Sequence, residues 1–216
     1  IHTGALAHNL TRARQAAPRP LGVCVDLTGR RLLGPDLGSD RVWVYRFAAG
    51  QPALAPHDPP WAAIHPGAGP RHLALYPGGR WIYCANELDA TVSLLAFDPD
   101  TGVLAEQGWV PLLPDGVDGD GSEIALDAAG RFLYASVRRH DSIALFAVAP
   151  DGSALTLIGH EPTRGRTPRH FALSPDGRLL VAANQDSDSL VTFRVDTETG
   201  KLAPTGHVAA VPSPAC

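Results

Sequence analysis

The stretch GRWIYCANELDATVSLLAF, Gly79–Phe97, begins with a Gly-Arg pair and continues as an apolar run, a polar tip and a second apolar run. The same order of features occurs three more times, in Gly29–Phe47, Gly130–Val148 and Gly177–Val195. Successive Gly-Arg pairs lie 50, 51 and 47 residues apart. A pattern that recurs about every fifty residues indicates a repeat protein in which each copy is one small group of elements.

Each copy has the sequence pattern of β-strands. Its apolar runs are short, rich in Val, Leu, Ile, Phe and Tyr, and bounded by Gly, Asp, Asn and Pro. A further apolar run precedes each Gly-Arg pair, and PGG, AAG or PDG supplies a tight turn between them in the last three copies. The turns in FDPDTGVL, VAPDGSAL and VDTETGKL lead to a fourth strand. We therefore predict an all-β fold, a β-propeller of about four four-stranded antiparallel blades, forming one domain over residues 1–216.

Antiparallel geometry places the start of the first strand of a blade beside the end of its second strand. The first strands start at Arg71, Glu123 and Arg169, and the second strands end at Leu37, Glu87, Arg138 and Gln185. These positions vary in chemistry while the framework repeats, so we expect them to form one mouth near the central axis. The Arg of each Gly-Arg pair does not vary, and we predict a framework role, covering strand edges with charge, for Arg30, Arg80, Arg131 and Arg178.

Charge and composition exclude several kinds of partner. The chain has 18 Lys and Arg against 22 Asp and Glu and no basic block, unlike a nucleic-acid-binding protein. No apolar run reaches the roughly 20 residues that a membrane-spanning helix needs. The 3 cysteines are far apart and favour a reducing, cytoplasmic location over a disulfide framework or zinc site. The chain lacks methionine and opens on Ile1, so we expect that the native N-terminal part is missing.

Several long phrases resemble the lactonase family of seven-bladed β-propellers, which includes bacterial 6-phosphogluconolactonases and fungal muconate-lactonizing enzymes. The phrases are GPRHLALYPGGRWIYCANEL from Gly69, SEIALDAAGRFLYASVRRHDSIALF from Ser122 and PRHFALSPDGRLLVAANQDSDSLVTF from Pro168. PDLGSDRVWVYRF from Pro35 and the closing VPSPAC from Val211 are similar too. The resemblance implies that the four repeats are the C-terminal part of a larger ring that lacks its N-terminal blades. Open blade edges would then allow self-association.

The resemblance also implies a function and a set of site residues. It implies a hydrolase that opens a phosphorylated or carboxylated lactone, as a 6-phosphogluconolactonase does in the pentose phosphate pathway, without metal or cofactor. The implied catalytic residues are Glu87, Arg71 and Arg138, and Arg169 and Glu123 are implied as substrate-binding residues. We add His72 and Gln185 as substrate-binding candidates because they lie at a strand start and a strand end of the predicted mouth.

One position departs from the family pattern. The family has a His-Ser pair whose histidine is catalytic in the muconate branch, and this chain has Leu21-Gly22 instead. Two alternatives therefore stay open. One is a catalytically impaired propeller that binds a ligand or acts as a scaffold, and the other is a muconate-type lactonizing enzyme.

The residue types themselves suit lactone hydrolysis. Glu87 or Glu123 could accept a proton from water if burial raised the pKa of its carboxyl toward neutrality. Arg71 or Arg138 could stabilise the oxyanion that forms at the carbonyl. Arg169 could hold the phosphate or carboxylate of the substrate with two parallel hydrogen bonds.

Structural explanations compete with these roles. Arg71 and Glu87 could form an ion pair between strands, and Glu123 could cap a turn. The string His140-Asp141-Ser142 contains the residue types of a catalytic triad, but triads are assembled from residues distant in the chain, so we do not expect a serine hydrolase. The acidic loop Leu113–Glu123 lacks the full EF-hand pattern, and we favour a solvated loop over a metal site.

Overall fold

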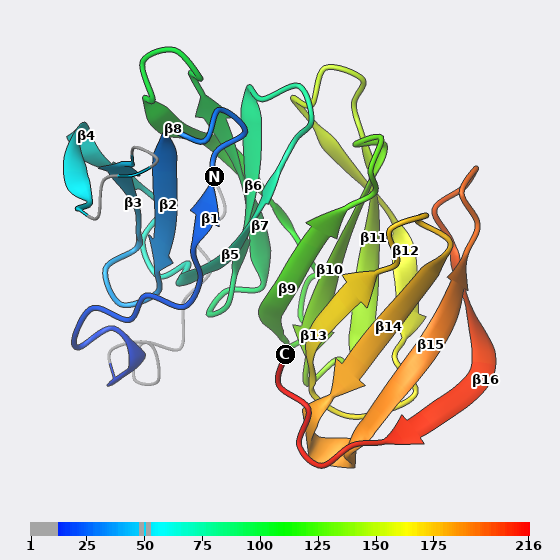
Figure 1. Ribbon diagram of the computed structural model, residues 1–216. Helices are drawn as coiled ribbons and strands as arrows, with labels where there is room; N and C mark the ends of the chain where they lie inside the picture. Colours follow the sequence, from blue (N-terminus) through cyan, green and yellow to red (C-terminus); the bar gives the residue numbers. More distant parts are fainter. Residues whose placement is uncertain (1–12, 48–49, 51–52) are drawn as a thin grey trace.

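The computed structural model describes residues 13–47, 50 and 53–216, and it confirms the all-β prediction (Figure 1). Its strands form four antiparallel sheets of four consecutive strands each. Blade I contains β1 (Cys24–Val25), β2 (Arg31–Asp36), β3 (Arg41–Arg46) and β4 (Ala55–Ala63). Blade II contains β5 (Pro70–Leu75), β6 (Trp81–Asn86), β7 (Thr91–Phe97) and β8 (Leu104–Pro111).

The last two blades repeat this order. Blade III contains β9 (Asp120–Leu126), β10 (Phe132–Arg138), β11 (Ser142–Val148) and β12 (Leu155–Pro162). Blade IV contains β13 (Pro168–Leu173), β14 (Leu179–Asn184), β15 (Ser189–Val195) and β16 (Leu202–Ala210), with a short 3₁₀ helix, η1 (Gln185–Ser187), after β14. Within these described ranges, no helix is both long and apolar enough to cross a membrane.

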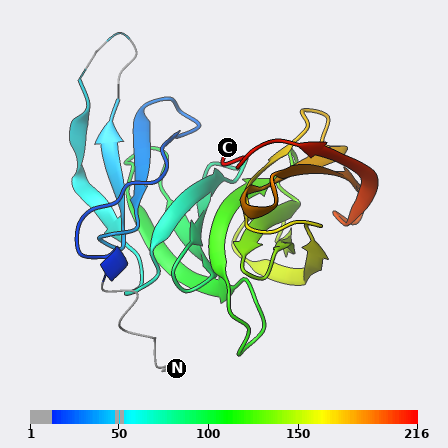
Figure 2. The ribbon, with the colours of Figure 1, turned by 90° about the horizontal axis from the view of Figure 1, so that it is seen from below.

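The blades lie side by side along an arc, with blade I (blue to cyan) and blade IV (orange to red) at its two ends (Figure 2). Each pair of neighbours is joined by its own apolar cluster. The alternation of side chains along a strand assigns each face. In β3, Val42 and Val44 are buried in the cluster shared with blade II, whereas Trp43 and Tyr45 line the opposite face of the sheet. The cores of this protein are therefore its interfaces between blades.

Buried tyrosines add hydrogen bonds to these interfaces. The hydroxyl of Tyr83 in blade II donates to the carbonyl of Gly152 in blade III at 2.7 Å. The hydroxyl of Tyr134 in blade III donates to the carbonyl of Gly200 in blade IV at 2.8 Å. Both glycines have positive φ, and a Cβ atom at Gly200 would lie only 2.7 Å from the ring of Phe132. The repeated hairpin before each outermost strand thus anchors one blade to the previous one.

The arginines of the Gly-Arg pairs also join blades, in contrast to their predicted role in covering strand edges. The guanidinium of Arg30 donates to the carbonyl of Pro99 at 2.9 Å, and that of Arg131 donates to the carbonyl of Thr197 at 2.7 Å. Both acceptors lie in a hairpin of the next blade. The framework role is therefore confirmed for these two arginines, but its physical basis is contact between blades.

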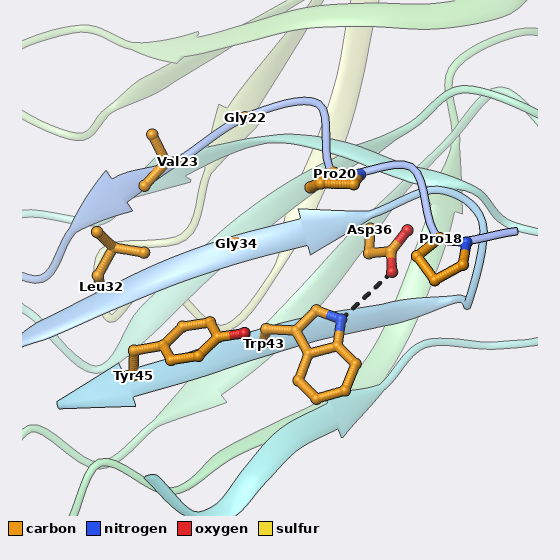
Figure 3. A pocket seen from close by; sticks show the side chains of 9 residues that line it. All are labelled: Pro18, Pro20, Gly22, Val23, Leu32, Gly34, Asp36, Trp43 and Tyr45. Carbon is orange, nitrogen blue, oxygen red and sulfur yellow. Dashed lines mark hydrogen bonds between the residues drawn. The ribbon is translucent and has the colours of Figure 1, made fainter. Parts of the chain in front are cut away.

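The face of blade I that points away from blade II has a cavity of about 370 Å³ (Figure 3). It is lined by Pro18, Pro20, Gly22, Val23, Leu32, Gly34, Asp36, Trp43 and Tyr45. The indole of Trp43 donates a hydrogen bond to the carboxylate of Asp36 at 3.3 Å, drawn as the dashed line. Val23 at its edge is 65% exposed, so this surface is apolar and open to water.

Replacing Tyr134 with Phe tests the tyrosine bonds between blades. We expect the free energy of unfolding to fall by about 1 kcal/mol, because the carbonyl of Gly200 loses its donor. Urea denaturation measures the change. Tyr45→Phe is the matched control, since the Tyr45 hydroxyl makes no hydrogen bond to other described residues, and it should leave stability within about 0.5 kcal/mol. Equal effects of the two substitutions would contradict this role of Tyr134.

Candidate active site

The starts of the first strands and the ends of the second strands meet, as the antiparallel geometry predicts. β5 packs against β9, and β9 packs against β13, so the innermost strands of blades II, III and IV are neighbours. Arg71 on β5, Glu87 directly after β6 and Arg138 at the end of β10 form one cluster of charges. Glu123 on β9 lies beside it and is linked to histidines of blades II and IV.

Two β-bulges set the direction of the arginines at the strand starts. On β5, Pro70 and His72 pair with consecutive residues of β6, so Arg71 between them is an extra residue with no partner in the ladder. On β13 the same irregularity leaves Arg169 as the extra residue. Bulges re-aim side chains and occur frequently beside functional sites. The same device therefore places an arginine at the start of blade II and of blade IV.

Glu87 is the centre of the cationic cluster. Its carboxylate lies 3.3 Å from Nε of Arg71 and 3.1 Å from Nη2 of Arg138, and it also accepts a hydrogen bond from Arg14. Only 3% of Glu87 is exposed. Burial alone raises the pKa of its carboxyl, but the charges of Arg138 and Arg14 outweigh burial and hold the pKa below the ordinary value. Glu87 is therefore ionised at neutral pH.

Arg71 has hydrogen-bonding capacity to spare. Its side chain is buried, and within the described residues its Nε and Nη1 atoms have no hydrogen-bond partner, nor does Nε of Arg138. Burial, together with the nearby charges of Arg138 and Arg169, lowers the pKa of Arg71 to about 10, although Glu87 and Glu123 act in the opposite direction. The group stays protonated at neutral pH. Buried donors without acceptors are costly, so an anion that supplied oxygen atoms here would be bound favourably.

Glu123 joins three blades through one oxygen atom. Oε2 lies 2.7 Å from Nδ1 of His72 in blade II and 3.1 Å from Nε2 of His170 in blade IV. Its other oxygen accepts a hydrogen bond from the backbone of Ile124, and its own backbone N–H donates to Ser136. Burial raises the pKa of Glu123, but the hydrogen bond and charge of His72 outweigh burial, and the pKa lies below its ordinary value.

The condition under which Glu87 or Glu123 could accept a proton from water, a pKa raised by burial toward neutrality, is therefore not met. Both carboxylates are buried, but Glu87 is paired with arginines and Glu123 accepts hydrogen bonds from His72 and from the backbone of Ile124, and this pairing has the larger effect on their pKa values. Neither carboxylate has the raised pKa of a general base. Their pairing suits them to hold arginine and histidine side chains in position.

Two of the predicted site residues, Arg169 and Gln185, contribute less directly to the cluster of charges. The guanidinium of Arg169 lies near enough to lower the pKa of Arg71, and it forms no ion pair with the described acids. Gln185 begins η1, and its side chain makes no hydrogen bond to the described residues of the cluster.

Sequence analysis missed Arg14. It precedes blade I, outside the repeats, and 44% of its side chain is exposed, yet it pairs with Glu87 of blade II. Because the contact spans 73 residues and has no counterpart in the other repeats, no periodic signal could have indicated it.

Leu21 and Gly22, which stand where the family has its His-Ser pair, lie beside the cluster. Leu21 is 38% exposed. Gly22 follows it and packs on the backbone of Arg71 and the imidazole of His72. A second cavity, of about 170 Å³, is bounded by residues of blades I, II and III that include Gly22, His72 and Glu123.

The consecutive residues His140-Asp141-Ser142 do not form a catalytic triad. Nδ1 of His140 lies 2.7 Å from Oγ of Ser142, but the carboxylate of Asp141 accepts a hydrogen bond from the backbone of Thr167 instead. In the acidic loop, Asp120 pairs with Arg139 at 2.9 Å. Among the described residues, no group of three or more His, Cys, Asp or Glu side chains could hold a metal ion.

Comparison with known proteins agrees with this architecture. The family model of lactonases, described as a seven-bladed β-propeller, matches residues 2–216. The 6-phosphogluconolactonase of Pectobacterium carotovorum is 36% identical over 193 residues, which are 88% of this chain and 57% of that protein. The 6-phosphogluconolactonase of Bacillus subtilis is 35% identical over 183 residues, 84% of this chain and 51% of that protein.

A solved structure is also similar over the whole chain. The periplasmic gluconolactonase of Pseudomonas aeruginosa superposes with a TM-score of 0.88 at 34% identity, covering 100% of this chain and 59% of that one. The chain thus spans between half and three fifths of the length of these relatives.

Replacing Glu87 with Gln tests its place at the centre of the cluster. We expect a loss of about 3 kcal/mol in the free energy of unfolding at neutral pH, because Arg71 and Arg138 lose their buried counter-charge. Glu161→Gln, which breaks the exposed pair with Arg164, should cost less than about 1 kcal/mol. Urea denaturation of the three proteins measures both values.

The difference in the free energy of unfolding between the original protein and Glu87→Gln should also depend on pH. Since the folded pKa of Glu87 is depressed, its stabilisation is present above the ordinary value of 4.5 and is lost as the pH falls through the folded pKa. The gap between the original protein and Glu87→Gln should therefore shrink in acid. A gap that is constant with pH would contradict ionisation of Glu87 in the fold.

Proposed function

The chain belongs to the lactonase family of seven-bladed β-propellers, and we propose that the protein opens an anionic sugar-acid lactone by adding water to it. The observation that carries this proposal is the cationic cluster at the inner strands. Four guanidinium groups, those of Arg14, Arg71, Arg138 and Arg169, surround two carboxylates, so the cluster is positive before any histidine is protonated. Because two relatives are 6-phosphogluconolactonases, we infer 6-phosphoglucono-δ-lactone as the substrate, in the pentose phosphate pathway.

The free donors of the cluster fit the charges of this reaction. Water attack on the lactone carbonyl places negative charge on the carbonyl oxygen, and Nη1 of Arg71 and Nε of Arg138 are buried donors without partners among the described residues. Donors that are in position before the reaction stabilise such an oxyanion by a few kcal/mol. The guanidinium of Arg169 is available for the phosphate. In this proposal Glu87 keeps the arginines in place and does not accept the proton from water.

One observation favours a second candidate, a propeller that binds the anion without hydrolysing it. The family histidine is replaced by Leu21, an apolar residue with no proton to exchange. A muconate-type lactonizing reaction would lack the same histidine. Calorimetry with 6-phosphogluconate, the reaction product, separates the candidates. Binding together with turnover supports the hydrolase, and binding alone supports the second candidate.

We also propose a cytoplasmic location, supported by the free thiols of Cys24, Cys84 and Cys216. The similar gluconolactonase of Pseudomonas aeruginosa is periplasmic, so the fold itself serves either compartment. Fractionation of expressing cells tests the location, and recovery in the periplasmic fraction would overturn it.

Hydrolysis of 6-phosphoglucono-δ-lactone, followed by pH-stat and corrected for opening in buffer, tests the activity in the protein encoded by the complete gene. Arg71→Lys should lower kcat/KM about 100-fold, because lysine keeps the charge but lacks the planar set of donors. Arg178→Lys is the matched control at a framework arginine and should retain full activity. Lactone opening no faster than in buffer would refute the hydrolase.

The exposed apolar face of blade I supports a proposal of self-association. Val23, Val25 and Leu27 are 65%, 45% and 59% exposed on or beside β1, next to the cavity lined by Trp43 and Tyr45. Contiguous apolar surface of this kind usually marks an interface. We propose that two copies of the 216-residue chain associate through this face.

Sedimentation of the 216-residue chain should therefore show dimers or larger species at micromolar concentration. Val23→Glu should shift it to monomers, since a charge would enter the apolar contact. The control, Val208→Glu, changes a valine that is 63% exposed on β16 of blade IV and should leave association unchanged. A monomeric original chain, or equal effects of both substitutions, would overturn the proposal.

A further inference from the structure

When the repeats are aligned on the apolar runs of their inner strands, the residues directly before those runs form a second column. In the aligned repeats they are Gly22, His72, Glu123 and His170. Glu123 belongs to this column, and Ser122 is the residue that aligns with Arg71 and Arg169. Glu123 lies in the middle blade and contacts the histidine on either side. This column has two imidazoles on one buried carboxylate, at the side of the cationic cluster.

The contact with Glu123 determines which nitrogen atom of His72 carries hydrogen. Glu123 is ionised, because its pKa is depressed, so its oxygen only accepts hydrogen bonds. Nδ1 of His72, at 2.7 Å from that oxygen, must therefore be the donor. In the neutral ring the lone pair is then on Nε2. A carboxylate that holds a histidine through Nδ1 and leaves Nε2 free is the arrangement that general-base histidines use.

The side chain of His72 lies next to a space that water can enter. The residues that line the cavity of about 170 Å³ include His72, Glu123 and Gly22. A water molecule takes up about 30 Å³ of liquid volume, so several waters fit. A Cβ atom at Gly22 would lie 3.1 Å from Cδ2 of His72 and 3.7 Å from its Nε2. Glycine at this position therefore leaves the imidazole edge uncovered.

The same strand start supplies the oxyanion donor. Arg71 directly precedes His72, and Glu123 is close enough to raise the pKa of Arg71, opposing the effect of Arg138. A water held by Nε2 of His72 and a carbonyl oxygen held by Arg71 would thus meet at adjacent residues. Bringing nucleophile and electrophile together in this way supplies a large part of a catalytic effect.

We propose that His72 is the general base of the lactonase reaction, with Glu123 as its positioning residue and Gly22 as the residue that leaves room for it. Nε2 takes one proton from water while the water oxygen bonds to the lactone carbonyl carbon. The bond from that carbon to the ring oxygen then breaks, and the ring oxygen leaves with the proton returned by the imidazolium. The new carboxylic acid releases its remaining proton to solvent.

This inference rests on the proposed function, but the role of His72 can fail its test while the proposed function stands. His72→Asn retains an amide donor toward Glu123 but removes the accepting Nε2 atom. In the protein encoded by the complete gene, we expect kcat to fall about 100-fold or more. KM and the affinity for 6-phosphogluconate should change less than threefold, because the arginines are untouched. Added imidazole should raise the activity of His72→Ala to at least a tenth of that of the original protein, because the shortened side chain leaves space for imidazole to bind.

His160→Gln is the matched control, since His160 is a half-buried histidine outside the site, and among the described residues its Nε2 donates one hydrogen bond, to the carbonyl of Leu112. It should retain kcat, and imidazole should not affect it. Urea denaturation checks that each variant is folded, and if His72→Ala is unfolded the kcat of His72→Asn decides. A kcat of His72→Asn within threefold of the original protein would overturn the role of His72 while the hydrolase stands. Absence of turnover in the original protein would overturn both.

Discussion

Face-to-face packing of neighbouring blades is the constraint on which the rest of this structure depends. A single four-stranded blade has two faces and cannot bury either by itself, so each apolar cluster is shared between two blades. The hydroxyls of Tyr83 and Tyr134 and the guanidinium groups of Arg30 and Arg131 connect the same pairs of blades through hairpin carbonyls. With the blades locked in this way, the ends of the inner strands are held at constant positions.

Charge pairing at those strand ends then determines the chemistry. Burial alone raises the pKa values of Glu87 and Glu123, but each carboxylate is paired with basic side chains that hold its pKa below the ordinary value. Glu87 collects arginines, and Glu123 collects histidines. The carboxylates therefore organise the site electrostatically, and several guanidinium donors remain without hydrogen-bond partners among the described residues.

The repeat in the sequence was sufficient to predict the blades and the convergence of Arg71, Glu87, Glu123 and Arg138, since these follow from strand alternation and antiparallel pairing. It was not sufficient for features that break the repeat. The bulges at Arg71 and Arg169 arise from local ladder geometry, and Arg14 reaches Glu87 from outside the repeats. The sign of the pKa shifts depends on distances between side chains of different blades, which a linear pattern does not contain.

The single oxygen atom of Glu123 that faces histidines of blades II and IV has a consequence for how such a site can evolve. Both of these blades begin with Pro-Arg-His, whereas blade III presents a glutamate at the corresponding position. Duplication of one ancestral blade would supply matching packing surfaces but three identical side chains here. A change at one position that does not belong to the packed faces between blades converts such copies into an asymmetric set, with histidine donors in two blades and a glutamate acceptor in the third. New specificity can thus be acquired at the strand starts without any compensating change in the cores between blades.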